Sequence, residues 1–318
     1  MCPPGKGDPP LERGIEELSP AHGASNLGLN YPLGRAKLRL EASMGIFFFR
    51  LSFLLYGVAT VGFFIYFYTL KPEALRGARG VLACGWLLHT GALLAGLKVL
   101  KAPPVANFYG AASFLAWTVV GAYFFLSYRG PKVYTLGSFL SPLILLLMIV
   151  AWRAPTALWP LPPSLKSFWF PIHALISLTS YAFFLIAAVA AVMYLLQERQ
   201  VKRKRLGGLF RRLPPLESLD RVNEKCLKYG FPLLTAGIVT GALWAEEAWG
   251  SFWSWDPKET WSLILWLIYA ALLHERFIVG WRGRRAAYMA LLGFAVWMVS
   301  FFIINLWMPG LHSYGRWS

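Results

Sequence analysis

The residue types most suited to chemistry gather in segment 244–261, where five tryptophans lie within eighteen residues. Tryptophan also anchors helix ends at membrane interfaces, but such belts need few aromatic residues at each end. Here the indoles form a local cluster that Gly250 interrupts. Clustered indoles offer a wide, rigid contact area, so we expect a flat apolar platform for a large planar ligand, with interfacial anchoring as the alternative. The five are Trp244, Trp249, Trp253, Trp255 and Trp261.

Two carboxylates of the same segment, Asp256 and Glu259, could act as a general acid and a general base. Their spacing favours a structural role. Asp256 has the side chain of a helix N-cap, Pro257 suits the first helical position, and Glu259 follows the cap by three residues. We therefore predict a capping box that opens a helix at Pro257 and fixes how the tryptophan segment joins that helix.

Histidine is the remaining candidate for chemistry, because its imidazole is a common ligand of metal ions. A lone histidine near a membrane interface is usually a polar cap, so the interpretation depends on which histidines share one side of the fold. The side of each histidine depends on how the helices cross the membrane. The five histidines are His22, His89, His173, His274 and His312.

The composition indicates a membrane protein, because 57% of the residues are hydrophobic and only 14% are charged. A soluble domain with this balance could not cover its apolar surface. About 20 apolar residues are needed for one helix to cross a bilayer. We therefore predict an all-α integral membrane protein with about eight transmembrane helices. The eight apolar runs lie near 45–70, 80–99, 108–127, 134–152, 171–197, 229–248, 259–275 and 286–308.

The positions of the basic residues predict the topology, since lysine and arginine accumulate in cytoplasmic loops. With segment 198–228 in the cytoplasm, the loops on that side carry nineteen lysines and arginines, whereas the opposite loops carry six. Eight spans then put both termini on the outer side. The basic block at 202–205, with Arg211 and Arg212, would face anionic lipid, so the net charge of +16 does not indicate nucleic-acid binding.

Two regions are expected along the chain. Residues 1–43 are rich in glycine and proline and lack an apolar run, which predicts a disordered tail. Met44 directly precedes the first span, so the tail could also be a mis-assigned start. Residues 44–318 form the polytopic membrane domain, with the tryptophan-rich outer segment at 244–261.

This topology sorts the histidines. His173 opens the fifth span and His312 follows the eighth, both on the outer side beside the tryptophan segment. Two imidazoles on opposite sides of a flat aromatic slot are what six-coordinate heme iron requires. His274 lies about fifteen residues, or roughly 22 Å, into the seventh span. An ionisable residue at that depth is a functional candidate, with packing against a polar neighbour as an equal alternative. His89 is expected to be structural, with a role in a site at the inner end as the alternative, and His22 is expected to have no role.

The motifs resemble those of a known family. The run W-G-S-F-W-S-W-D-P-K-E-T-W from Trp249 is similar to the tryptophan-rich signature of heme-handling cytochrome c assembly proteins. The continuation L-I-Y-A-A-L-L-H-E-R to Arg276 resembles the CcsA/ResC branch of the System II pathway in particular. Further similarity lies in F-P-I-H-A-L-I-S-L-T-S-Y-A ending at Ala182 and in P-G-L-H-S-Y-G around His312. The resemblance covers roughly residues 45–318.

The resemblance implies a function as well as a fold. It assigns His173 and His312 as axial ligands of heme b at an outer site, and His274 as a ligand of heme that enters from the cytoplasm. It also implies a CcsB/ResB-type membrane subunit as partner, which supplies the second inner ligand, and an apocytochrome c with a C-x-x-C-H motif as substrate. The expected location is the bacterial plasma membrane. The cofactor-binding segment would include Trp244, Trp249, Trp253, Trp255 and Asp256.

Other classes of function fit less well. The three cysteines form neither a C-x-x-C pair nor a C-x-x-C-H run, which excludes a thiol oxidoreductase and a c-type heme carrier. A solute or ion transporter would be expected to show inverted repeats, broken helices and buried charges. Two readings stay open: a subunit that presents heme for thioether formation, and a heme exporter or chaperone that hands heme to a separate synthase.

Overall fold

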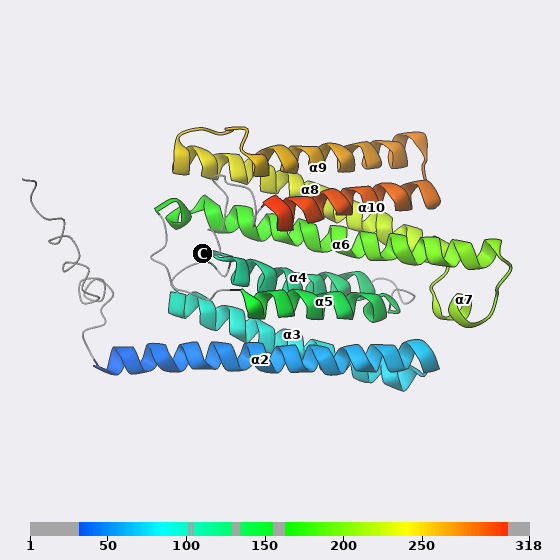
Figure 1. Cartoon of the computed structure of the whole chain (residues 1–318), viewed down its shortest axis with the longest axis horizontal. Coiled ribbons are helices and arrows are strands. Elements are labelled where there is room, and N and C mark those ends of the chain that lie inside the picture. Colours follow the sequence, from blue (N-terminus) through cyan, green and yellow to red (C-terminus); the bar gives the residue numbers. More distant parts are fainter. Residues whose placement is uncertain (1–31, 101–102, 104, 129–133, 155–162, 305–318) are drawn as a thin grey trace, which may run out of the picture.

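The computed structural model describes residues 32–100, 103, 105–128, 134–154 and 163–304, and all the regular structure in these ranges is helical (Figure 1). Eight of the helices are long and apolar enough to cross a membrane. The predicted fold class and number of spans are confirmed. The long helices are α2 (Pro32–Thr69), α3 (Pro72–Leu100), α4 (Phe108–Tyr128), α5 (Leu136–Arg153), α6 (Trp169–Lys202), α8 (Leu216–Trp249), α9 (Pro257–His274) and α10 (Arg284–Met298).

Short elements connect or extend these helices. The 3-10 turn η4 (Pro163–Lys166) precedes α6, and the short helix α7 (Gly208–Arg212) lies between α6 and α8. Two π-helical segments follow directly on α-helices: η5 (Glu275–Val279) continues α9, and η6 (Val299–Ile304) continues α10. These extensions let α9 and α10 reach further along the bundle than their α-helical bounds suggest.

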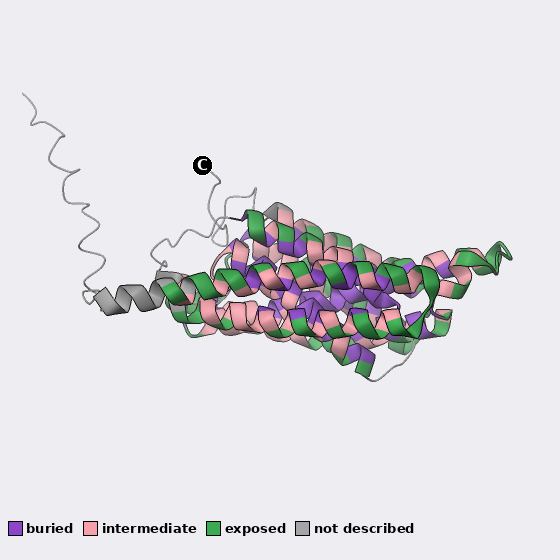
Figure 2. Cartoon of the chain, turned by 90° about the horizontal axis from the view of Figure 1, so that it is seen from below, coloured by how far each residue is buried: buried purple, intermediate pink, exposed green. Residues whose placement is uncertain are grey.

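Helix α6 lies between α4 and α5 on one side and α8 to α10 on the other (Figure 1), and every residue from Ser180 to Ala191 is buried. Figure 2 shows that the buried residues gather in the interior of the bundle. Alanines are frequent between Ser180 and Ala191, and small side chains let neighbouring backbones approach closely. Helix α8 also has a small residue at its contact with α6. A Cβ atom at Gly230 would lie 2.6 Å from the ring of Phe184 on α6. The pairing of α6 with α8 is therefore tight, and it positions the candidate site.

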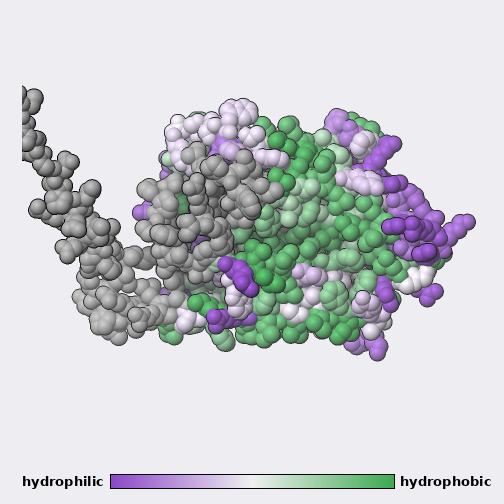
Figure 3. All heavy atoms as spheres, viewed as in Figure 1, coloured by the Kyte–Doolittle hydropathy of each residue, from purple (hydrophilic) through white to green (hydrophobic). Residues whose placement is uncertain are grey.

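The surface matches a membrane environment. On the face seen in Figure 3, apolar residues cover the middle of the helices, and hydrophilic residues gather at the end that holds α7. The N-terminal end of α6, the C-terminal end of α8 and the start of α9 lie together at the opposite end of the bundle (Figure 1). The tryptophan segment and the basic segment are thus at opposite ends.

Three helices begin well before the apolar runs predict, and one of them is α3, which starts at Pro72 rather than near residue 80. Helix α8 starts at Leu216 rather than near residue 229, and its polar first turns carry ion pairs at helical spacing, such as Arg221 with Glu217. Helix α2 starts at Pro32, ahead of the boundary expected at Met44. Good helix formers fill residues 35–43, and proline suits a first helical turn. Residues 1–31 lie outside the described part of the chain.

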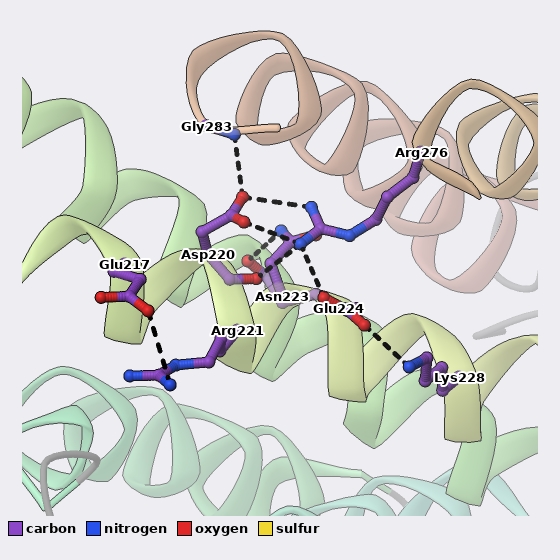
Figure 4. A network of polar contacts seen from close by, with 9 residues as sticks. Glu217, Asp220, Arg221, Asn223, Glu224, Lys228, Arg276 and Gly283 are labelled. Carbon is purple, nitrogen blue, oxygen red and sulfur yellow. Dashed lines mark hydrogen bonds and ion pairs between the residues drawn. The ribbon is translucent and has the colours of Figure 1, made fainter. Parts of the chain in front are cut away.

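A buried ion-pair cluster joins α8 to the junction of α9 and α10 (Figure 4). The Arg276 side chain is only 2% exposed and donates to both carboxylate oxygens of Asp220, at 3.1 and 2.8 Å. It also donates to Glu224 at 3.2 Å. The same Asp220 carboxylate accepts a hydrogen bond from the backbone N–H of Gly283 at 2.8 Å. This cluster fixes the turn that follows His274.

The Arg276 cluster yields a stability prediction. Asp220→Ala should lower the free energy of unfolding by about 3 kcal/mol, because it leaves a buried guanidinium with an incomplete set of partners. The matched control is Glu217→Ala in the exposed pair with Arg221, which should cost less than about 1 kcal/mol. Unfolding by SDS in mixed micelles measures both. Equal losses in the two variants would contradict the buried-clamp interpretation.

Candidate functional site

His173 is held by α8 rather than by its own helix. It lies in the second turn of α6, half-buried, and its Nδ1 atom is 2.7 Å from the backbone carbonyl oxygen of Gly237. A carbonyl oxygen only accepts hydrogen bonds, so Nδ1 must carry the proton. In the neutral ring the lone pair is then on Nε2. This is the tautomer in which an Nε2 ligand of a metal is oriented by a second partner on Nδ1.

The His173 ring also stacks on a tryptophan. The rings of His173 and Trp244 have centroids 5.7 Å apart and an interplanar angle of 22°. Trp244 is itself buried and contacts Phe170 and Trp249, with centroid distances of 5.1 and 4.8 Å. The sequence-predicted residues His173, Trp244 and Trp249 are therefore brought into one cluster at the end of α6 and α8.

The turn that joins α8 to α9 is built around the Glu259 carboxylate. Gly250 ends α8 in the left-handed conformation, as expected for a helix C-terminus. Glu259 accepts hydrogen bonds from the backbone N–H groups of Ser254 at 2.8 Å and Asp256 at 3.2 Å. Trp255, between them, has a φ of 59°, which is uncommon for a residue other than glycine. The two hydrogen bonds hold this strained conformation, and the Trp255 side chain stays 69% exposed.

The predicted capping box is present. The Asp256 side chain accepts from the backbone N–H of Lys258 at 2.8 Å, and Glu259 binds back to the N-cap backbone. Both carboxylates are buried and engaged with backbone donors. This arrangement supports the capping role over acid–base chemistry.

The tryptophans differ from the flat platform that the sequence suggested. Trp244 and Trp249 are tilted by 59°, and Trp253 meets Trp255 edge to face at 88°. These two pairs do not form one stacked slab. The left-handed residue Gly250 lies between them in the chain, and the left-handed residue Trp255 belongs to the second pair. The buried indole of Trp244 instead supports His173. The exposed aromatic surface comes from Trp255 and its neighbour Phe252, which are 69% and 55% exposed.

The N-cap gives a second prediction. Asp256→Ser and Asp256→Asn should preserve the start of α9, because serine and asparagine are also good caps. Asp256→Ala should destabilise it by about 1 kcal/mol. Hydrogen exchange of the backbone amides at 257–260 reports this directly. Equal loss of function in all three variants, with normal amide protection, would indicate that the carboxylate contacts the ligand.

The other histidines lie elsewhere. His274 ends α9 at the opposite end of the bundle, about 26 Å along the helix from Pro257, and its side chain is exposed. His89 is fully buried between α2, α3 and α4, and its ring nitrogens lie 3.2 Å from the Tyr56 hydroxyl and 2.8 Å from the Ser113 hydroxyl. These two partners support a structural role for His89. His312 lies outside the described residues, as does His22.

Comparison with known proteins decides the family. The model of the family described as "Cytochrome C assembly protein" matches residues 105–312. The chain belongs to this family. Helices α4 to α10 lie within the matched region, and so does the cluster of His173 with Trp244 and Trp249. Helices α2 and α3 precede it.

Curated relatives carry the same family name. The cytochrome c biogenesis protein CcsA of Guillardia theta is 38% identical over 231 residues, which cover 67% of this chain and 76% of that protein. CcsA of Synechocystis sp. is 33% identical and covers 77% and 90%. CcsA of Synechococcus elongatus is 36% identical and covers 70% and 83%. These are CcsA-type relatives of this cytochrome c assembly protein over most of its length.

A solved structure shares the fold. The cytochrome c heme lyase CcmF superposes with a TM-score of 0.63 at 18% sequence identity, over 82% of this chain and 46% of that longer chain. At this identity the likeness concerns the fold alone. It shows that this arrangement of helices also occurs in a cytochrome c heme lyase.

Sequence reasoning missed the residues of α8 that hold His173. Gly237 accepts from His173, and Gly241 packs against its ring. A signal was present, because two glycines four residues apart in an apolar helix often mark close helix packing. The hydrogen bond from Ser167 to Glu247, which ties the start of α6 to the end of α8, had no such signal.

Proposed function

We propose that this protein carries heme across a membrane and holds it at the tryptophan-rich end of the bundle for covalent attachment to apocytochrome c. The observation that carries the proposal is the His173 imidazole, with Nδ1 bound to a backbone carbonyl and its ring stacked on Trp244. A neutral imidazole oriented in this way has the chemistry of an iron ligand. Family membership and the CcsA relatives support the same function.

In this proposal His173 and His312 would be the residues that bind the iron of an outer heme b. Trp249, Trp253, Trp255 and the Asp256 cap would line the surface beside it. His312 lies outside the described residues, so its part rests on the sequence motif around it. The exposed Trp255 and Phe252 would supply contact area for heme or for the docked apocytochrome.

In thioether formation the reacting groups are those of the heme and of the apocytochrome c. A cysteine thiol of the C-x-x-C-H segment adds across a heme vinyl group, so its S–H proton goes to one carbon and its sulfur bonds to the other. No external oxidant is needed. The chain's residues bind and orient the heme and exclude water, and no acid–base pair is assigned, because Asp256 and Glu259 already bind backbone donors.

His274 is proposed as a ligand for heme entering from the cytoplasmic side, with the second ligand from a CcsB/ResB-type subunit. The His274 side chain is exposed, which supports a heme site that this chain shares with the partner subunit.

The second candidate function is a heme exporter or chaperone that does not form the covalent bond. The chain and its partner should be co-expressed with an apocytochrome in cells that lack other assembly factors, and a denaturing gel stained for heme. Covalent staining supports attachment, whereas heme found only in the membrane fraction supports export.

The proposed function requires the tryptophan segment on the outer side, in a bacterial plasma membrane with both termini outside. The excess of lysine and arginine at the α7 end supports this orientation. A reporter enzyme fused after Arg212 should be active in the cytoplasm, and one fused after residue 318 should be active outside. The reverse result would show that His173 lies on the cytoplasmic side, which would contradict the proposed function.

A further inference from the structure

One face of α8 provides three different contacts to His173. Gly237, Gly241 and Trp244 are spaced by four and three residues, so they lie along one side of the helix. Gly237 contributes its carbonyl oxygen, which accepts from Nδ1 at 2.7 Å. Trp244 contributes the ring that stacks on the imidazole. The imidazole is therefore positioned by α8 from two directions.

Gly241 leaves the space that the ring occupies. A Cβ atom at this position would lie 2.7 Å from Nδ1 and 2.8 Å from Cε1 of His173, closer than real Cβ contacts. The imidazole thus lies directly against the α8 backbone. Gly237 is equally restricted, because a Cβ there would lie 2.5 Å from Oγ of Ser177, one turn further along α6.

We propose that Gly237 and Gly241 are positioning residues that fix the tautomer and the ring orientation of His173 for iron ligation. This inference rests on the proposed function, since it assumes that His173 binds heme iron. The carbonyl of Gly237 keeps the proton on Nδ1, so Nε2 retains the lone pair. The missing side chain of Gly241 keeps the ring close enough to make that hydrogen bond and to stack on Trp244.

A general role in helix packing is the competing explanation, and the chain offers a matched control. Gly230 lies on the same helix and in the same α6–α8 contact, where a Cβ would lie 2.6 Å from the Phe184 ring. It does not touch His173 in the described contacts. Gly230→Ala and Gly241→Ala should therefore disturb the packing of α6 and α8 to a similar degree, but only Gly241→Ala displaces the imidazole.

The test uses the full chain with its partner subunit and two measurements. In heme-free protein labelled with ¹⁵N-histidine, Gly241→Ala should shift the His173 ring nitrogens away from the Nδ1–H tautomer, whereas Gly230→Ala should not. His173→Asn assigns the signals. In heme titrations, Gly241→Ala should weaken outer-site affinity by about 10–100-fold and convert part of the six-coordinate spectrum to a five-coordinate one.

The outcomes separate the two ideas. If Gly241→Ala and Gly230→Ala give the same tautomer signals and the same heme affinity, the positioning role is wrong and the glycines serve packing alone. If His173→Asn retains outer heme with an unchanged spectrum, the proposed ligand role of His173 is wrong, whatever the glycine variants do.

Discussion

Replacing His173 with alanine is expected to remove heme from the outer site and to stop cytochrome c maturation, while the protein still inserts and heme is still retained at the inner site. The reason is that His173 is the one described histidine that lies against the tryptophan segment, in contact with Trp244 and bound through Nδ1 to Gly237. Loss of an axial ligand opens the iron coordination sphere. The heme content and visible spectrum of the purified complex measure the effect.

Two variants separate ligation from structure. His173→Asn keeps an N–H donor for the Gly237 carbonyl but offers no imidazole lone pair, so it should lose outer heme as fully as His173→Ala. Phe168→Ala, at an exposed position at the same end of α6, should behave like the wild-type protein. Imidazole in the medium should restore part of the function to His173→Ala. Recovery of normal maturation in His173→Asn would indicate that the hydrogen bond, rather than iron ligation, is what matters.

The second large effect is expected at the other end of the bundle. His274→Ala should lower the heme content of both sites, although His173 is intact, because heme that is not received at the cytoplasmic end cannot reach the outer end. His274 ends α9 and is exposed, next to a turn fixed by Arg276 and Asp220. Heme content of the purified complex and covalent heme on the apocytochrome are the two measurements.

The control for His274 lies on the same segment. Ile278→Ala changes a 73% exposed side chain in η5 and should leave heme content unchanged. Thermal stability of His274→Ala should also match the wild-type protein, since the Arg276 cluster does not include the imidazole. Normal outer-site heme in His274→Ala would contradict an upstream role, and a collapse in stability would point to packing instead.

Local patterns in the sequence predicted the local features well. Apolar runs identified eight spans, and the spacing of Asp256, Pro257 and Glu259 predicted the capping box, because a helix start is determined by residues close together in the chain. The helix bounds were less accurate. The start of α8 extends beyond the apolar run, since charged turns stabilised by ion pairs can continue a helix outside a bilayer.

Features that depend on tertiary contacts were not predictable in the same way. The hydrogen bond from His173 joins residues of two different helices, and its partner is a backbone carbonyl that no side chain identifies. The orientation of the indoles depends on the left-handed residues Gly250 and Trp255, and Glu259 binds the backbone N–H groups on both sides of Trp255. Residue spacing alone therefore suggested a flat platform where the structure has tilted pairs.

Outer-site ligation by two histidines is tested most directly by the visible spectrum of the purified protein with its partner subunit, compared between the wild type and His173→Ala/His312→Ala. We expect a six-coordinate, bis-histidine outer heme in the wild type and its absence in the double variant, with inner-site heme retained through His274. An unchanged bis-histidine spectrum from outer-site heme in the double variant would contradict it, and the tryptophan segment would then be better explained as a membrane-interface anchor.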